Sequence, residues 1–207
     1  MGQVHRIVGL IGFGATLIVG SPAAAQAPAG VLPAATALAE TGPARPVPAW
    51  TALCAEIPAE CAVDPGEPET LRLTRSAWQL IRSVNARVNA AVTPLTDERH
   101  WGTADLWGFP EDGFGDCEDY QLQKRRLLVA AGLPRRALLM TVVVDETGEG
   151  HAVLLVRTDR GDFVLDNKAD AVRAWDRTGY VFVKRESASG AWASLGNIAS
   201  PVTTANR

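Results

Sequence analysis

The stretch Gly113-Phe114-Gly115-Asp116-Cys117-Glu118-Asp119-Tyr120 places one cysteine among three carboxylates where a helix begins. Asp116 is a good N-cap residue, and the two acids after the cysteine fall in the first turn, where negative charge suits the helix dipole. A thiol at such a helix start is favoured as the thiolate, the form that attacks carbonyl carbon. The flanking charges oppose its ionisation, so either they face away from Cys117 or a cation neutralises them.

The helix after this stretch is predicted to run from Glu118 to about Ala131, because Gly132 and Pro134 end the pattern. Apolar residues recur on the stripe that carries Cys117, so the side with the thiol is also the side that packs inward. Lys124 lies on the same stripe and interrupts it.

The chain has 207 residues, of which 47% are hydrophobic, and a formal net charge of −3. These values predict one globular domain of ordinary size. No basic run is interleaved with aromatic residues, which argues against nucleic acid and anionic membranes as partners.

The N-terminus predicts export. Residues 1–25 have a positively charged start, an apolar run and a small-residue end, which is the pattern of a cleaved signal peptide. An uncleaved anchor is disfavoured because the apolar run is short and Ser21-Pro22 breaks it. Residues 26–49, rich in Ala and Pro, predict a flexible leader, and residues 50–200 the folded domain. The expected location is periplasmic or secreted.

Export permits disulfides, and the chain has three cysteines. Cys54 and Cys61 are the favoured pair because they lie close together before the first long helix. Cys117 then remains as a thiol outside the disulfide.

A second helix is predicted before the opening stretch, from the helical spacing of apolar residues between Ala77 and Val92. Its Asn85 and Asn89 share a face, where we expect exposed polar positions rather than contacts to neighbouring backbone. The aromatic-rich loop Leu95 to Phe114 admits two interpretations, a substrate-groove wall or tryptophans that cap the core.

Strands are predicted after the nucleophile helix. Three apolar runs separated by short glycine-containing gaps indicate antiparallel hairpins. They span Leu138 to Val144, Ala152 to Arg157 and Phe163 to Leu165, and further strands are expected at Tyr180 to Lys184 and at residues 191–193.

A cysteine nucleophile needs a histidine to take its proton and a third group to orient that histidine. His5 is removed with the signal peptide, so the candidate bases are His100 and His151. His100 has no evident orienting partner, whereas His151 starts a strand. Asp166 ends the next strand and shares a face with His151 if the connecting loop has two or four residues. The competing interpretation is a structural histidine and an ordinary turn aspartate.

Three motifs in order, Gly115 to Tyr120, Gly150 to Leu154 and Gly161 to Asn167, resemble the bacterial transglutaminase-like cysteine proteinases. With weaker likenesses upstream, the resemblance runs from about Trp50 to Trp192. It implies an α+β, papain-like or transglutaminase-like fold, with the nucleophile helix packed on an antiparallel sheet. In the implied triad the nucleophile is Cys117, the general base His151 and the orienting residue Asp166.

The resemblance also implies kinship with a periplasmic calcium-dependent protease that releases biofilm adhesins. In this sequence the implied calcium ligands are Asp116, Glu118 and Asp119. Calcium favours several oxygen ligands and would neutralise the acids around the thiol. The implied partners are a protein or peptide substrate, with a surface adhesin as one candidate, and an inner-membrane regulator.

We therefore predict an exported cysteine endopeptidase (a thiol protease) whose oxyanion hole includes the Cys117 backbone N–H. Three alternatives are open. The triad could transfer acyl groups as a transglutaminase does, or the chain could be a calcium-dependent binding module without turnover. A zinc hydrolase using His100, His151 and a carboxylate ranks last, because no recognised ligand spacing is present.

Overall fold

The computed structural model describes residues 1–2 and 31–196. The chain divides into two units, Met1–Val31 and Leu32–Arg207, and every element described below belongs to the second. All but the first two residues of the predicted signal peptide lie outside the described residues. Within the described ranges, no helix combines the length and apolar character that crossing a bilayer requires.

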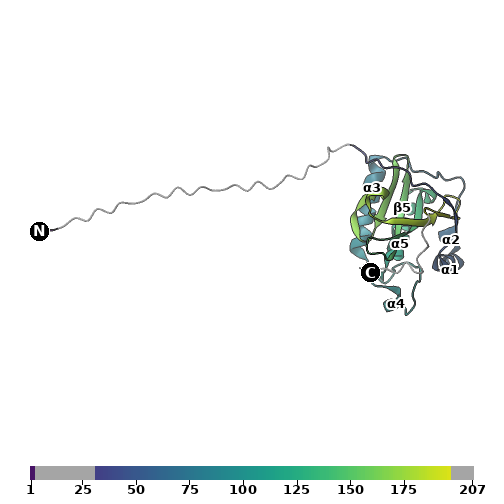
Figure 1. Ribbon diagram of the computed structural model, residues 1–207, viewed down its shortest axis with the longest axis horizontal. Helices are drawn as coiled ribbons and strands as arrows, with labels where there is room; N and C mark the ends of the chain where they lie inside the picture. The colour runs from purple at the N-terminus through teal and green to yellow at the C-terminus, as the bar shows by residue number, and fades with distance from the viewer. Residues whose placement is uncertain (3–30, 197–207) are drawn as a thin grey trace. The chain divides into compact units, whose positions relative to one another are not determined.

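The described residues contain five α-helices, each labelled in Figure 1. They are α1 (Pro48–Glu56), α2 (Pro58–Cys61), α3 (Arg75–Ala91), α4 (Asp97–His100) and α5 (Cys117–Ala130), with 3-10 turns η1 (Arg135–Ala137) and η2 (Trp175–Arg177). The two long helices, α3 and α5, were both predicted from the sequence. Thr74 caps α3 by accepting a hydrogen bond from the Ala77 N–H at 3.1 Å.

Seven strands form one sheet in the order β1-β9-β8-β4-β5-β6-β7, and every neighbouring pair is antiparallel. Their bounds are β1 (Gly42–Ala44), β4 (Leu138–Val144), β5 (Gly150–Thr158), β6 (Gly161–Asp166), β7 (Ala169–Ala174), β8 (Val181–Glu186) and β9 (Trp192–Ser194). A separate parallel pair joins β2 (Thr93–Pro94) to β3 (Phe114–Gly115). The predicted antiparallel hairpins are confirmed.

The two edge strands, β1 and β7, were not predicted. β1 is Gly-Pro-Ala, which has little strand propensity and tolerates proline because one side of an edge strand needs no ladder hydrogen bond. β7 is rich in alanine and polar residues and has no fully buried side chain. Both strands form because a neighbouring strand offers hydrogen bonds, which local sequence does not reveal.

The predicted flexible leader differs from the structure in its described part, residues 31–49. Leu38 is buried, and its N–H donates to Asp162 Oδ2 at 2.9 Å. The Ala35 carbonyl passes so close to Gly161 that a Cβ there would lie 2.3 Å from it, and Gly161 also has a φ of +97°. A few backbone hydrogen bonds and buried apolar side chains therefore hold a segment whose composition suggested a linker.

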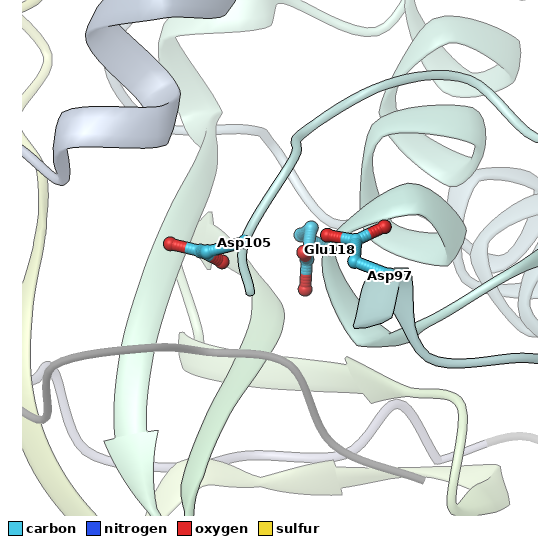
Figure 2. A group of neighbouring side chains, drawn as sticks. All are labelled: Asp97, Asp105 and Glu118. Atoms are coloured by element: carbon cyan, nitrogen blue, oxygen red, sulfur yellow. The ribbon is translucent and has the colours of Figure 1, made fainter. Parts of the chain in front are cut away.

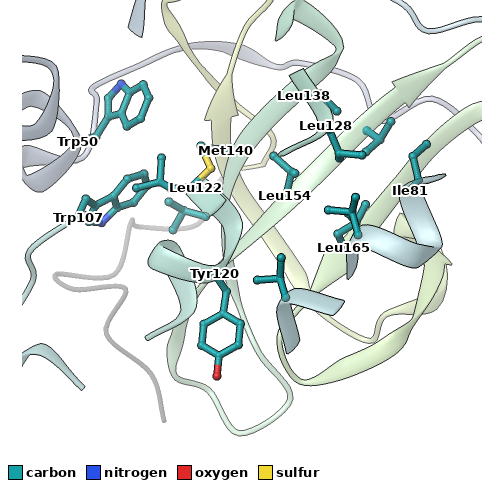
Figure 3. Packing of buried hydrophobic residues seen from close by; sticks show 14 of the residues in the cluster. Trp50, Ile81, Trp107, Tyr120, Leu122, Leu128, Leu138, Met140, Leu154 and Leu165 are labelled. Atoms are coloured by element: carbon teal, nitrogen blue, oxygen red, sulfur yellow. The ribbon is translucent and has the colours of Figure 1, made fainter. Parts of the chain in front are cut away.

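The sheet buries both faces. The larger hydrophobic cluster lies between the sheet and helices α1, α3 and α5, and includes Trp50, Ile81 and Leu154 (Figure 3). The smaller cluster, on the other face, includes Leu155 and the leader residue Leu38. Successive residues of β5 thus enter different clusters, as the alternation of side chains along a strand requires.

Asn85 and Asn89 of α3 hold neighbouring backbone, so the expectation that they are exposed polar residues is wrong. Asn85 Nδ2 donates to the carbonyl oxygens of Ala169 at 2.9 Å and Asp170 at 3.1 Å. Asn89 Nδ2 donates to the Asp166 carbonyl at 2.9 Å. These amides fasten the turn between β6 and β7 to α3.

Replacing Asn85 by alanine is expected to lower the free energy of unfolding by about 2 kcal/mol, because a fully buried side chain that donates to two carbonyls is lost. Denaturant unfolding would measure the change. Ser83→Ala, at an exposed position of the same helix, is the matched control and should stay within about 0.5 kcal/mol of wild type. An equal stability of the two variants would contradict this role for Asn85.

The predicted disulfide between Cys54 and Cys61 is present. It joins α1 to α2, where the Glu60 carbonyl accepts hydrogen bonds from Arg135 Nη2 at 2.6 Å and Arg125 Nη2 at 3.3 Å. Arg125 is a fully buried residue of α5. The disulfide-bonded segment is thereby anchored to the helix that begins with Cys117.

Candidate active site

Helix α5 begins at Cys117, with Asp116 as its N-cap residue. The Asp116 N–H donates to Asp119 Oδ2 at 3.3 Å, which satisfies a backbone donor at the helix start. Gly115 permits this arrangement, since a Cβ there would lie 2.7 Å from the same Asp119 oxygen. The sequence prediction of a capped helix start is confirmed.

The Cys117 side chain is fully buried and lies outside the disulfide. Its Sγ accepts a hydrogen bond from the Ala152 N–H at 3.3 Å and lies 3.1 Å from Glu118 Oε2. Burial raises the pKa of the thiol well above its usual value, and the carboxyl groups of Glu118 and Asp116 raise it further. The sequence predicts that the helix start favours the thiolate and that the flanking acids oppose it. In the fold the opposing effect of the acids is present.

His151 and Asp166 meet as the strand register allows. β5 and β6 pair Leu154 with Leu165, the register of a Thr158 to Gly161 loop, which puts the two residues on one face as diagonal neighbours. His151 Nε2 lies 2.9 Å from Asp166 Oδ1. Both side chains are buried.

Asp166 accepts two further hydrogen bonds beside the one that it shares with His151. The Tyr180 hydroxyl donates to Oδ2 at 2.6 Å, and the Lys168 N–H donates to Oδ1 at 3.0 Å. Burial opposes ionisation of Asp166, but the hydrogen bonds from His151, Tyr180 and Lys168 outweigh it and lower its pKa to about 2. The carboxylate is therefore charged and fixed in place at neutral pH.

The second ring nitrogen of His151, Nδ1, is buried and has no hydrogen-bond partner among the described residues. Its neighbour in β5, Ala152, touches the Cys117 sulfur. A histidine with one nitrogen on a carboxylate and the other available is arranged to exchange a proton with a nearby nucleophile.

Five acidic side chains gather beside the start of α5. Potential ligand atoms of Asp97, Asp105 and Glu118 lie within 4.8 Å of one another, as do those of Asp97, Asp116 and Asp119. Figure 2 shows the first group, in which Asp97 from α4 and Asp105 from the loop after it lie beside Glu118. The sequence interpretation found the three acids around Cys117 and missed the two in the loop, which are 12 to 20 positions earlier and have no spacing signal.

The loop is bound to the helix start through these acids. Asp116 Oδ2 accepts a hydrogen bond from the Asp97 N–H at 3.2 Å, and Asp119 Oδ1 accepts one from the Gly108 N–H at 2.9 Å. Asp97 Oδ2 accepts one from the Leu106 N–H. The other oxygen of Asp116, Oδ1, is buried without a hydrogen-bond partner in the described part of the chain.

Burial and mutual repulsion oppose ionisation of the carboxyl groups in the acidic cluster. Burial and the neighbouring acids raise the pKa of Asp116 to about 6 and that of Asp119 to about 8. Burial followed by the charge of Asp116 raises the pKa of Glu118 well above its usual range. Several oxygens within a few ångströms, among them Asp116 Oδ1 without a hydrogen-bond partner in the described part of the chain, fit a hard divalent cation such as calcium.

The core-cap interpretation of the aromatic loop is confirmed for Trp107, and the substrate-groove interpretation stays a prediction. Trp107 is buried with its ring 5.6 Å from that of Trp50, so it caps the core, whereas Trp101 is largely exposed. His100 stacks on Trp101 and pairs with Asp112 at 2.9 Å, so the expectation that it lacks a partner is wrong. Within the described ranges no group of potential metal ligands contains a histidine, which leaves the zinc alternative without a site there.

Comparison with known proteins gives two kinds of match. A family model described as bacterial transglutaminase-like cysteine proteinase matches residues 40–199. A structure of Legionella pneumophila LapG is 27% identical, covers 58% of this chain and 71% of that chain, and has a TM-score of 0.51. A calcium-bound structure of LapG is 25% identical, with 62% and 81% coverage and a TM-score of 0.47. Among curated proteins nothing matches. The predicted α+β fold class is confirmed.

Proposed function

Because the chain belongs to the bacterial transglutaminase-like cysteine proteinases, a family of cysteine peptidases, we propose that it is an exported endopeptidase with a triad of Cys117, His151 and Asp166. The observation that carries the proposal is the hydrogen bond of 2.9 Å between His151 Nε2 and Asp166 Oδ1. This bond occupies Nε2, so Nδ1 is the nitrogen that can accept the proton of the Cys117 thiol. Nδ1 is buried without a hydrogen-bond partner in the described residues.

In this proposal the chemistry proceeds through a thioester. Cys117 Sγ passes its proton to His151 Nδ1 and attacks the peptide carbonyl carbon, while the Cys117 backbone N–H stabilises the developing oxyanion. The C–N bond breaks as His151 returns the proton to the leaving amine. Water, deprotonated by His151, then hydrolyses the thioester and restores the thiol. Asp166 holds the imidazole tautomer through both steps.

The raised pKa of Cys117 requires a positive charge nearby for efficient ionisation. The proposed calcium ligands are Asp116, Glu118 and Asp119 from the helix start, joined by Asp97 and Asp105 from the loop. Bound calcium would supply the charge that offsets these carboxylates. The protein's own contribution is to hold the loop against α5, which brings acids from two segments together.

The substrate class follows from the reaction and the location. An exported endopeptidase acts on proteins of the periplasm or cell surface, and a surface adhesin is the candidate that the family resemblance raises. Control by an inner-membrane partner is part of the same proposal. Export itself rests on the charged, apolar and small-residue pattern of residues 1–25.

The test incubates the purified mature protein, with calcium, with exported proteins of the source bacterium and a fluorescent primary amine. New protein N-termini without amine incorporation are expected, and mass spectrometry of labelled N-termini would identify them. Incorporation of the amine into substrate would establish acyl transfer instead. Calcium binding with neither product would identify a binding module and would overturn the proposed peptidase.

A further inference from the structure

Lys124 is a buried cation on the helix that begins with Cys117. It follows the thiol by seven positions, about two helical turns along the same stripe. The residue is fully buried, and its Nζ has no hydrogen-bond partner among the residues that the structure describes. The nearest aromatic contact is the Tyr120 ring, 5.8 Å away. An ammonium buried without hydrogen bonds is costly, so its presence requires a compensating interaction.

The compensating charges come from the end of β6 and the start of β7. Burial is the largest effect on Lys124 and lowers its pKa to about 7, while the charges of Asp166 and Asp170 act in the opposite direction. Its own helix contributes the Tyr120 ring. On β5 the titratable group is His151, which is already hydrogen-bonded to Asp166.

The remaining element packed on this turn, α3, contributes amide hydrogen bonds and one exposed cation, Arg82, which lines the same surface hollow as Asp170. Asn89 Nδ2 donates to Asp170 Oδ1 at 3.0 Å and to the Asp166 carbonyl at 2.9 Å. Asn85 binds the carbonyls of the same turn. The amides fix the backbone of the turn, but they leave its negative charge uncompensated. On the buried side of the turn, α5 is joined to it by Gln121, whose Nε2 donates to Asn167 Oδ1 at 3.3 Å, and Lys124 is the buried cation one turn further along that helix.

We propose that Lys124 is a positioning residue of the triad, in which its buried ammonium is the counter-charge of Asp166 and Asp170 behind His151. The inference rests on the proposed peptidase function. The two interactions of Asp166 have different purposes: His151 is its hydrogen-bond partner, and Lys124 offsets its charge from the side of α5. The ammonium lowers by one the net negative charge of the site in which Cys117 must lose its proton.

The sign of the effect on activity follows from this charge. Loss of the ammonium makes the surroundings of Asp166 more negative, which raises the pKa of that carboxyl and weakens its hold on the imidazole at low pH. The acid limb of the pH profile of kcat/KM should therefore move to higher pH. Above the pKa of Lys124 the wild-type amine is itself neutral, so wild type and a neutral variant should converge there.

The kinetic experiment compares wild type, Lys124→Met and the matched control Lys184→Met, which removes another largely buried lysine that lies in β8. For Lys124→Met the acid limb of the pH profile is expected to move to higher pH by roughly half a unit to one unit. At a fixed pH on that limb this is a roughly three- to tenfold loss of kcat/KM. Rates near pH 8.5 should stay within about twofold of wild type. Lys184→Met should follow the wild-type profile, and Lys124→Arg should restore the limb.

A profile of Lys124→Met that coincides with wild type, or that falls equally at every pH, would overturn the proposal. The uniform fall would indicate a packing role alone. Thermal unfolding of Lys124→Met accompanies the kinetics, and we expect a stable fold because methionine fills the same buried volume without a charge.

A second measurement needs no activity and separates this inference from the proposed function. The chain has only three lysines, so the side-chain NMR signals of Lys124 can be followed through a pH titration of the Cys117→Ala protein. Adding Asp166→Asn should lower the titration midpoint of Lys124, because a stabilising negative charge is gone. An unchanged midpoint would refute the coupling. A wild-type protein that cleaves nothing would instead refute the peptidase.

Discussion

Cys117→Ala and His151→Ala are each expected to lower kcat/KM by about 10⁴-fold or more, and the double variant should be no worse than the more damaging single one. The reason is that the thiol and the imidazole act as one unit, so removing either ends the proton transfer and the attack together. The measurement is cleavage of a peptide that spans a site identified among the exported proteins. Unfolding temperatures should show that each variant remains folded.

His100→Ala is the matched control for the histidine. His100 also pairs with an aspartate, Asp112, at 2.9 Å, but it lies in the aromatic loop and has no contact with the triad among those described here. Its loss should change kcat/KM by less than about threefold. If the losses of kcat/KM in the two single variants multiply in the double variant, His151 does not act together with Cys117. A large loss in His100→Ala would show that the assigned histidine is wrong.

Calcium is expected to raise the unfolding temperature of the protein by about 5–10 °C, which corresponds to about 2.7 kcal/mol at a hundredfold excess over Kd. The increase should be larger at pH 8 than at pH 5. In the metal-free protein the pKa values of Asp116 and Asp119 are raised to about 6 and about 8. A raised folded-state pKa contributes stability at low pH that is lost as the pH rises through that pKa.

The metal-free protein should thus lose stability between about pH 4 and pH 8, and calcium should cancel the loss by taking the place of the protons. Differential scanning calorimetry with calcium or with a chelator measures both effects. Asp97→Asn should reduce the calcium-induced shift, while Asp112→Asn, an exposed acid of the same loop, should preserve it. A shift of equal size in both variants would place calcium elsewhere.

The elements that sequence reasoning located are those with strong local signals. Helix α5 has a cap residue at one end and glycine at the other, and β4 is a continuous apolar run whose bounds, Leu138–Val144, were predicted as observed. The pairing of His151 with Asp166 could also be anticipated, because the parity of a hairpin loop fixes which residues share a face.

What the sequence did not show depends on contacts between distant segments. Tyr180 reaches Asp166 from the position just before β8, and nothing near position 180 indicates that its hydroxyl has this partner. Asp97 and Asp105 join the acidic cluster only because their loop folds over α5. In the sequence Lys124 only interrupts an apolar stripe. The fold brings it under the influence of two carboxylates, those of Asp166 and Asp170.

Strand β5 contributes to the site through consecutive residues: His151 supplies the imidazole, and the Ala152 N–H touches the sulfur of Cys117. Side chains alternate along a strand, so inserting or deleting a single residue inside β5 would exchange the positions of imidazole and methyl group while the sheet could still form. The connection before β5 is held in another way, through the buried Asp145, which accepts hydrogen bonds from the N–H groups of Thr147 and Glu149 and pairs with Lys168. For protein engineering, a graft into the β4–β5 turn must keep Asp145, and the length of β5 up to Ala152 must also be kept.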